Sequence, residues 1–279
     1  MKPQLKNAKP FLRWAGSKKQ LIPILSQYWD SSYNRYVEPF AGSASLFFNI
    51  APSAALLSDI NVDLIATYSQ IKNNLPAVIR SLYKLKKSPE NYMRIRAMDP
   101  SKLSPSTRAA RFIFLNRYCF NGLYRTNRAG IFNVPYGGDR SGDLPNKLHL
   151  KACSTCLKTA RLVSCGFSTT LEAVVPGDFV YMDPPYSVKA QRVFSEYDAS
   201  VFSEKQLKLV KQWMRKLDRK GIPFLVSYAS SNEGEFLSKG FYTQVVSVKR
   251  NIAGFAANRR RSDELLISNV HPSKEGEIL

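Results

Sequence analysis

An α/β fold with a mainly parallel sheet and a helical insertion is what the sequence predicts, and three observations support it. The stretch RYVEPFAGSASLFFNI (35–50) reads as a short strand, a glycine turn and a helix, and AALLSDI (54–60) reads as a strand ending in an acid. Helical patterns fill residues 61 to 121, and strand patterns return after about residue 160. Strand, glycine turn, helix, strand and acid in this order are typical of a Rossmann-like nucleotide-binding unit.

The middle of the chain is predicted to be helical and then irregular. NVDLIATYSQIKNN (61–74) carries apolar residues at near-helical spacing, and TRAARFIFLNRYCF (107–120) is a second helical candidate. Residues 122 to 149 are rich in Gly, Asn, Arg and Pro and are predicted to form a loop.

The last part of the chain returns to alternating strands and helices. Ser203 and Gln206 form a capping box, which predicts that a helix begins there. The final two strands are expected to pair antiparallel around a basic loop. The predicted strands are RLVSCGF (161–167), DFVYMD (178–183), IPFLVSY (222–228), FYTQVVSVK (241–249) and DELLISNV (263–270). We therefore predict one discontinuous sheet domain, residues 1–60 and 160–279, and an inserted helical and loop domain, residues 61–159.

Composition indicates an anionic polymer as the partner. Among 279 residues, 41 are Lys or Arg and 21 are Asp or Glu, which gives a formal charge of +20. No stretch has the roughly 20 apolar residues of a membrane helix, and MKPQLKNAKP lacks the apolar region of a signal peptide. Nucleic acid is the leading partner, with solubility conferred by charge as the alternative, and we expect a cytoplasmic protein. The four cysteines include the pair Cys153 and Cys156, for which free thiols are expected rather than a metal site.

Several features are predicted to meet at the carboxyl edge of the sheet, where open α/β sheets bind ligands. Phe40, Asp59 and Asp183 each stand at or near a strand end. Gly42 allows a sharp turn and a close approach of the backbone to a ligand. Asp59 either binds a ribose or caps the helix that follows it, and the first interpretation is modestly favoured.

The stretch DPPY (183–186) suits chemistry on an exocyclic amine. Such an amine is a poor nucleophile because its lone pair is delocalised into the ring. A carboxylate and a backbone carbonyl that accept its two hydrogens localise the lone pair, and the carboxylate takes up positive charge as the bond forms. Prolines fix the carbonyl, and a tyrosine ring can stack on a base that has left its helix.

Four blocks carry a resemblance to a known family. FLRWAGSKKQLIP, VEPFAGSAS, LNRYCFNGLYRTNRAGIFNVPYG and DPPY, in this order, resemble the Dam-type adenine-N6 DNA methyltransferases of the D12 class, and the similarity covers most of the chain. The resemblance implies a Rossmann-like methyltransferase sheet with a target-recognition insertion. It also implies that S-adenosylmethionine gives its methyl group to adenine N6 in duplex DNA and becomes S-adenosylhomocysteine, with no metal.

The resemblance also implies roles for individual residues. The catalytic residues would be Asp183, Pro184, Pro185 and Tyr186. The cofactor site would include Trp14, Lys18, Phe40, Gly42, Asp59 and Asp183. Within the target-reading segment 116–137, Arg125 would read a guanine edge, Leu123 and Pro135 would face thymine methyl groups, and Phe120 would wedge into the stack. The other expected DNA contacts are Arg13, Asn121, Asn127, Arg128, Tyr197, Arg259 and Arg260.

The sequence departs from the family pattern at three places. Ala44 stands where the family turn ends in glycine, and Ser17 replaces a common glycine in WAGSK. Both changes bear on cofactor affinity. GDRSGD (138–143) lacks an aromatic and basic pair of some relatives, which bears on target recognition.

Other functions stay open at this point. Cytosine-N4 methylation uses the same amine chemistry, but its enzymes more often carry Ser where Asp183 stands. Methylation of RNA or of a protein glutamine uses related motifs, and a DNA-binding protein without catalysis is the alternative from another class. The expected target is GATC, the expected state is a monomer near a bacterial or phage nucleoid, and a cognate restriction endonuclease is an optional partner.

Overall fold

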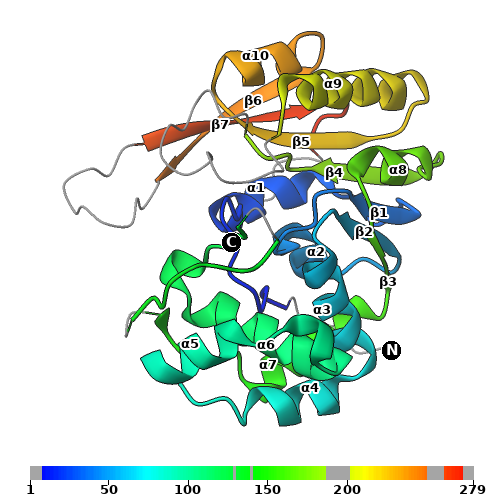
Figure 1. Cartoon of the computed structure of the whole chain (residues 1–279). Helices are drawn as coiled ribbons and strands as arrows, with labels where there is room; N and C mark the ends of the chain where they lie inside the picture. Colours follow the sequence, from blue (N-terminus) through cyan, green and yellow to red (C-terminus); the bar gives the residue numbers. More distant parts are fainter. Residues whose placement is uncertain (1–7, 128–129, 139–140, 187–201, 250–260, 273–279) are drawn as a thin grey trace.

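The computed structural model describes residues 8–127, 130–138, 141–186, 202–249 and 261–272. Its centre is a seven-stranded sheet with the order β3-β2-β1-β4-β5-β7-β6 (Figure 1). The strands are β1 (Arg35–Glu38), β2 (Ala55–Asp59), β3 (Ala160–Ser164), β4 (Asp178–Met182), β5 (Phe224–Ala229), β6 (Tyr242–Lys249) and β7 (Arg261–Ser268).

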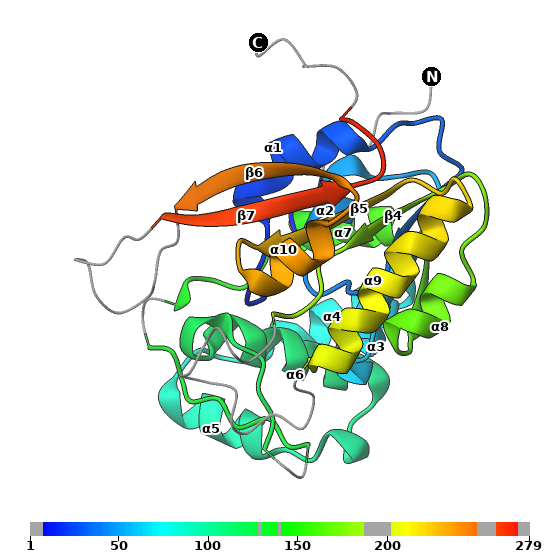
Figure 2. The same ribbon diagram turned by 90° about the horizontal axis from the view of Figure 1, so that it is seen from above.

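The pairing of the strands confirms the predicted α/β class. β1, β2, β3, β4 and β5 are parallel, and β7 pairs antiparallel with both β5 and β6. Figure 2 shows β6 and β7 running side by side at one end of the sheet. The antiparallel pair predicted for the last two strands is therefore confirmed.

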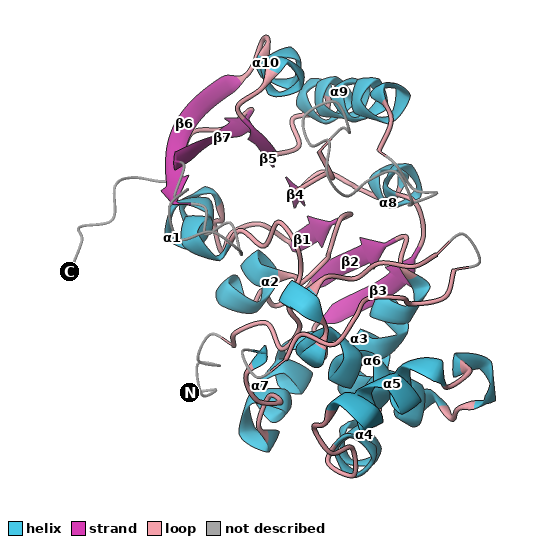
Figure 3. Cartoon of the chain, turned by 60° about the vertical axis from the view of Figure 1, so that its left-hand side comes forward, coloured by secondary structure: helices cyan, strands magenta, loops and turns pink. Residues whose placement is uncertain are grey.

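Both faces of the sheet are buried. Successive side chains of a strand point to opposite faces, and here each face packs against its own apolar cluster. Tyr36 belongs to one apolar cluster and its neighbour Val37 to the other, and the same alternation separates Tyr181 from Val180. The helix α2 (Ser45–Ile50) contributes to the first cluster, whereas α8 (Phe167–Glu172) and α9 (Glu204–Arg219) contribute to the second. Figure 3 shows helices on the two sides of the sheet.

The predicted capping box begins α9. The Ser203 hydroxyl accepts from the Gln206 amide at 3.3 Å, and the Gln206 side chain accepts from the Ser203 amide at 2.8 Å. These two bonds satisfy amides that the first turn of a helix leaves without partners.

A group of helices lies beyond β3 (Figure 1). It contains α4 (Leu75–Leu82), α5 (Pro89–Ala97), α6 (Pro105–Tyr118) and α7 (Lys147–Leu157). The helix α3 (Val62–Asn73) contacts α6 and α7 on one side and β2 and β3 on the other. It therefore joins this group to the sheet.

The loop predicted for residues 122–149 was too long, because α7 begins at Lys147. Asn146 caps this helix, since its side-chain oxygen accepts from the His149 amide at 2.8 Å. Three further helices, α1 (Ile22–Leu25), α8 and α10 (Asn232–Ser238), had no sequence prediction. The strand predicted for residues 161–167 was too long, because β3 ends at Ser164 and α8 begins at Phe167. All three helices are short, and four to seven residues give a weak periodic signal.

Ala44 occupies a left-handed conformation, with φ 50° and ψ 42°, directly before α2. Left-handed backbone disfavours any residue with a Cβ. We expect Ala44→Gly to raise the free energy of unfolding by about 0.5–1 kcal/mol, because relief of this strain exceeds the extra entropy of an unfolded glycine. Urea unfolding of the two proteins measures the difference.

The matched control is Ala41→Gly in the same turn, because Ala41 has no positive φ. That change should lower the free energy of unfolding by about 0.5–1 kcal/mol. An equal loss of unfolding free energy in both variants would contradict backbone strain at Ala44.

No helix among the described residues is long and apolar enough to cross a membrane.

Candidate active site

The turn after β1 is fixed from three sides. The Gly42 amide donates to Asp59 Oδ2 at 3.0 Å, and the Gly42 carbonyl accepts from the Tyr68 hydroxyl at 2.6 Å. Gly42 has φ 46°, and a Cβ there would lie 2.9 Å from Trp14 Cδ1. The close approach of the indole ring leaves no room for a Cβ and therefore requires glycine at this position.

Asp59 supports the turn and does not cap α3. Its Oδ1 accepts from the Asn61 amide at 2.9 Å, and the cap is Asn61, whose side chain accepts from the Leu64 amide at 3.0 Å. The helix-cap alternative for Asp59 was therefore wrong. Burial raises the pKa of Asp59, and the amides of Asn61 and Gly42 work against that rise.

Asp183 follows the last residue of β4 and meets two side chains from distant parts of the chain. Its Oδ1 accepts from the Ser227 hydroxyl on β5 at 3.0 Å and lies 3.3 Å from Lys18 Nζ. Ser227 in turn lies 2.9 Å from the Tyr181 hydroxyl on β4. Neighbouring parallel strands thus hold one oxygen of the predicted catalytic carboxylate.

Lys18 is shared between Asp183, Tyr186 and Glu264. Its Nζ lies 2.5 Å from the Tyr186 hydroxyl and 3.3 Å from Glu264 Oε2. The Tyr186 hydroxyl donates to Glu264 Oε1 at 2.8 Å, and the ring packs edge-on against Tyr228 with centroids 5.1 Å apart. These distances place one ammonium between two carboxylates and a phenol. Both Lys18 and Glu264 are buried.

The protonation states of this cluster depend on its charges. Burial by itself lowers the pKa of Lys18, but Asp183, Tyr186 and Glu264 together raise it above its usual value. Burial raises the pKa of Asp183, Lys18 and the Ser227 hydrogen bond lower it, and Glu264 raises it again. The net result is a carboxylate with a raised pKa beside a firmly protonated lysine.

A third carboxyl group lies at the end of β1. Glu38 is buried and accepts from the Tyr36 hydroxyl at 3.0 Å. Burial raises its pKa well above the usual value, and the charges of Asp183 and Asp59 add to this rise. Burial and the neighbouring carboxylates therefore both favour the neutral form of Glu38.

Aromatic rings cover the same edge on the side of α8. Phe40 stacks on Phe167 with centroids 5.1 Å apart and meets Phe202 edge-on at 6.0 Å. Within the motif after β4, Pro184 is buried and Pro185 is exposed. The edge thus combines an apolar wall with one polar cluster, which is typical of small-molecule sites.

Ser17, one of the departures from the family pattern, takes part in a group of three hydroxyls. Its Oγ lies 3.0 Å from Ser45 Oγ and accepts from Ser43 Oγ at 3.4 Å. Ser43 and Ser45 lie 2.9 Å apart. The side chain in place of glycine therefore ties the amino-terminal block to the start of α2.

The amino-terminal block also touches the predicted target-reading segment. Trp14 stacks on Tyr124 with centroids 5.7 Å apart and an angle of 18°. The Asn116 side chain accepts from the Arg13 amide at 2.8 Å and donates to the Arg13 carbonyl at 2.7 Å. One short segment thus contacts both the glycine turn and the segment 116–137.

The target-reading segment folds back on itself. The Phe120 amide donates to the Pro135 carbonyl at 2.9 Å, and Arg125 Nε donates to Asn133 Oδ1 at 3.0 Å. Phe120, Asn121 and Pro135 are exposed, and Asn121 has φ 54°. The loop therefore exposes an aromatic ring and polar groups while its backbone is held by internal hydrogen bonds.

Three other residues predicted to contact DNA are partly engaged within the protein. Asn127 Oδ1 accepts from the Ile131 amide at 3.0 Å and closes a turn, although the residue is exposed. Leu123 is half-buried against the main core. Arg13 Nη1 lies 3.4 Å from the Arg117 carbonyl.

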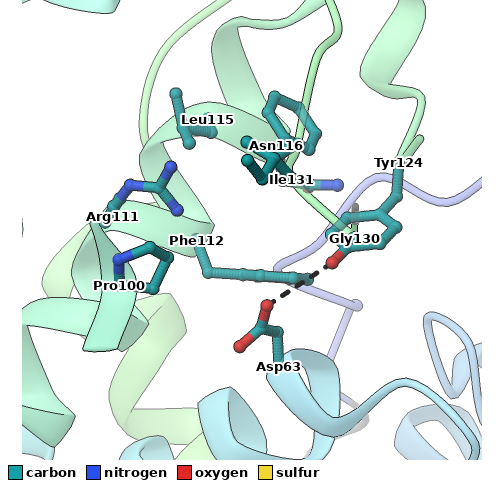
Figure 4. Close-up of a pocket in the computed structure, with 10 residues that line it drawn as sticks. Asp63, Pro100, Arg111, Phe112, Leu115, Asn116, Tyr124, Gly130 and Ile131 are labelled. Atoms are coloured by element: carbon teal, nitrogen blue, oxygen red, sulfur yellow. Dashed lines mark hydrogen bonds between the residues drawn. The ribbon is translucent and has the colours of Figure 1, made fainter. Parts of the chain in front are cut away.

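A cavity of about 90 Å³ is lined by residues of this segment and of α6, and its lining does not include Asp183 (Figure 4). Two of the lining residues are hydrogen-bonded, since the Tyr124 hydroxyl donates to Asp63 Oδ2 at 3.5 Å. The lining is Asp63, Pro100, Arg111, Phe112, Leu115, Asn116, Tyr124, Gly130, Ile131 and Phe132.

Four predicted DNA contacts, Arg128, Tyr197, Arg259 and Arg260, lie outside the described residues. Within the described ranges, no group of three or more His, Cys, Asp or Glu side chains could hold a metal ion.

Sequence reasoning missed three polar residues of the site. Ser227, Glu38 and Glu264 all lie on strands and are buried. The available signal was a polar residue inside an apolar strand, in PFLVSY, RYVEPF and DELLIS.

The fold and the site together define a class of protein: an α/β enzyme with DPPY at the end of its fourth strand. Comparison with known families makes this specific. A model of the D12 class N6 adenine-specific DNA methyltransferases matches residues 14–252. The chain belongs to this family and is an adenine-specific DNA methyltransferase.

Individual relatives agree with the family. A Type II methyltransferase, M1.LlaDCHI of Lactococcus lactis subsp. cremoris, is 33% identical over 94% of this chain and 96% of its own length. The Type II methyltransferase M.MjaIII of Methanocaldococcus jannaschii is 32% identical over 94% of this chain and 99% of its own length. The DNA adenine methylase of Escherichia coli K12 is 30% identical over 94% of this chain and 95% of its own length.

Proposed function

We propose that the enzyme transfers a methyl group from S-adenosylmethionine to N6 of an adenine flipped out of duplex DNA, within GATC. The observation that carries this proposal is Asp183, held at the sheet edge by Ser227 and Lys18 and followed by two prolines and a tyrosine. The target GATC rests on the resemblance of residues 116–137 to the family's reading segment.

The residues of the edge fit such a cofactor. Gly42 permits a close backbone approach, Asp59 is anchored beside it, and the Trp14 ring lies against the turn. The carboxylates of Asp183 and Glu264 favour a positively charged group nearby. When bound, S-adenosylmethionine supplies an electrophilic methyl group on a sulfonium.

Asp183 and the carbonyl of the proline pair would accept the two hydrogens of the adenine amine and localise its lone pair. N6 would attack the methyl carbon that the bound cofactor supplies, and the sulfur would keep the electron pair of the broken carbon–sulfur bond. N6 would then lose one proton, which the Asp183 carboxylate would accept. Tyr186 would give the flipped base a face on which to stack.

We propose that residues 61–159 form the target-recognition unit and that residues 1–60 and 160–279 bind the cofactor. The exposed Phe120 would fill the gap that the flipped base leaves. The enzyme would act as a monomer on the nucleoid in the cytoplasm.

The proposal is tested with tritiated S-adenosylmethionine and plasmid DNA from a methylation-free host, followed by digestion to nucleosides. Label in N6-methyl-2′-deoxyadenosine is expected, and sequencing of the methylated plasmid should place it in GATC. Label in methylcytosine, or no label, would contradict the activity, whereas adenine methylation elsewhere would contradict only the target.

The Arg125→Ala variant tests the reading of one base pair. If the guanidinium makes a bidentate contact to guanine, its loss should reduce discrimination at that pair by about 1–3 kcal/mol. Relative methylation rates on oligonucleotides with single substitutions measure this quantity. A uniform loss on all sequences would instead make Arg125 a phosphate contact.

A further inference from the structure

Glu264 stands out among the residues that neither the motif nor the family resemblance assigns to the site. It lies on β7, is 3% exposed, and its carboxylate meets both Lys18 and the Tyr186 hydroxyl. A carboxylate at such depth is costly unless it is paired and hydrogen-bonded. Lys18 and Tyr186, with which it interacts, also border Asp183.

The geometry makes Glu264 and Asp183 competitors for one ammonium. Lys18 Nζ lies 3.3 Å from an oxygen of each. A lysine drawn wholly to Asp183 would hold that carboxylate as a tight ion pair, and a bound amine would then find a weaker acceptor. Glu264 draws the ammonium to its own side.

We propose that Glu264 is a positioning residue for methyl transfer: it divides Lys18 between two carboxylates and holds Tyr186, so that Asp183 stays available to the adenine amine. This inference rests on the proposed function. It also implies that the Glu264 charge helps the site to bind the sulfonium cation of S-adenosylmethionine more tightly than the neutral thioether of S-adenosylhomocysteine.

The groups that face Asp183 come from several elements. They are Lys18 before α1, Tyr36 and Glu38 on β1, Tyr181 on β4, Tyr186 after β4, Ser227 on β5 and Glu264 on β7. The charge of Glu264 raises the pKa of Asp183, and that of Lys18 lowers it. Removal of the Glu264 charge should therefore lower this pKa.

The test is Glu264→Gln, which keeps the shape and an acceptor for the Tyr186 hydroxyl but removes the charge. The acid limb of the single-turnover rate should move to lower pH by about one unit, and the maximal rate should fall about tenfold. Affinity for S-adenosylmethionine should weaken about five- to tenfold, while affinity for S-adenosylhomocysteine stays nearly constant, because only the first carries the charge.

Two variants separate charge from shape. Glu264→Asp keeps the charge, so its acid limb and its preference for the sulfonium should stay near those of the wild type even if its rate falls. Asp263→Asn changes the exposed neighbour on the same strand and should leave all these quantities unchanged. Thermal unfolding checks that each variant is folded. If Glu264→Gln does not fold, the acid limb and cofactor preference of Glu264→Asp provide the test.

The coupling to Lys18 is measured in a double-variant cycle. In a Lys18→Met background, Glu264→Gln should lower the maximal rate much less than it does in the wild type, because no ammonium remains to move onto Asp183. An equal loss of rate in both backgrounds, or an unmoved acid limb in Glu264→Gln, would overturn the inference. A wild-type enzyme without adenine methylation would overturn the proposed function instead, and the affinity measurements still report on Glu264 in that case.

Discussion

Asp183→Asn is expected to lower the single-turnover rate of methyl transfer by about 10³-fold, because the amide has the size of the carboxylate but neither its charge nor its capacity to take a proton. Ser227 can still donate to the remaining oxygen, so the strand end should keep its place. Tritium transfer to an oligonucleotide duplex measures the rate, and a gel-shift titration measures DNA affinity, which should be nearly unchanged.

The matched control lies at the other end of the same strand. Asp178 is buried and receives two hydrogen bonds from the Arg35 guanidinium, at 2.6 and 3.0 Å. Asp178→Asn should therefore lower thermal stability while the rate of transfer by the folded protein stays near that of the wild type. A fully active Asp183→Asn enzyme would remove Asp183 from its assigned role.

Lys18→Met should move the acid limb of the transfer rate to higher pH by about one to three units. The sign follows from the charges around Asp183. Burial raises the pKa of Asp183, and the Lys18 ammonium lowers it. Loss of the ammonium should therefore raise this pKa further. The variant should be less active than the wild type on the acid side and should recover activity as the pH rises through the new pKa.

The same variant should also become less stable, relative to the wild type, as the pH rises. Above the raised pKa the carboxylates of Asp183 and Glu264 are both charged and have lost their shared ammonium, which disfavours the folded state. The control is Lys19→Met, which removes an exposed neighbouring charge and should leave the acid limb in place. An unmoved limb in Lys18→Met would show that Lys18 does not set the charge of Asp183.

Strand positions and the glycine turn were predictable because they depend on local chemistry. Alternation and apolar runs report burial directly, and the capping box at Ser203 marks a helix start within four residues. The carboxyl edge of the sheet followed from topology alone, which placed Gly42 and Asp59 together before any contact was known.

The polar cluster was not predictable because its members are far apart in sequence. Lys18 and Glu264 are separated by 246 positions, and only the folded sheet brings them together. A buried glutamate in DELLIS is visible as an exception to the apolar pattern, but nothing local identifies its partners. The role of Asp59 was ambiguous for a related reason, since Asn61 two positions later offers the same capping chemistry.

The order of the strands has a consequence for synthesis on the ribosome. β7 follows the other described strands in the sequence, yet in the sheet it lies between β5 and β6. β6 is therefore joined to the sheet only through β7, and Lys18 meets Glu264 only after the 246 positions that separate them have been synthesised. A nascent chain that stops before β7 would have an open sheet edge and an incomplete catalytic cluster, so chemistry on DNA begins only after translation has passed residue 268.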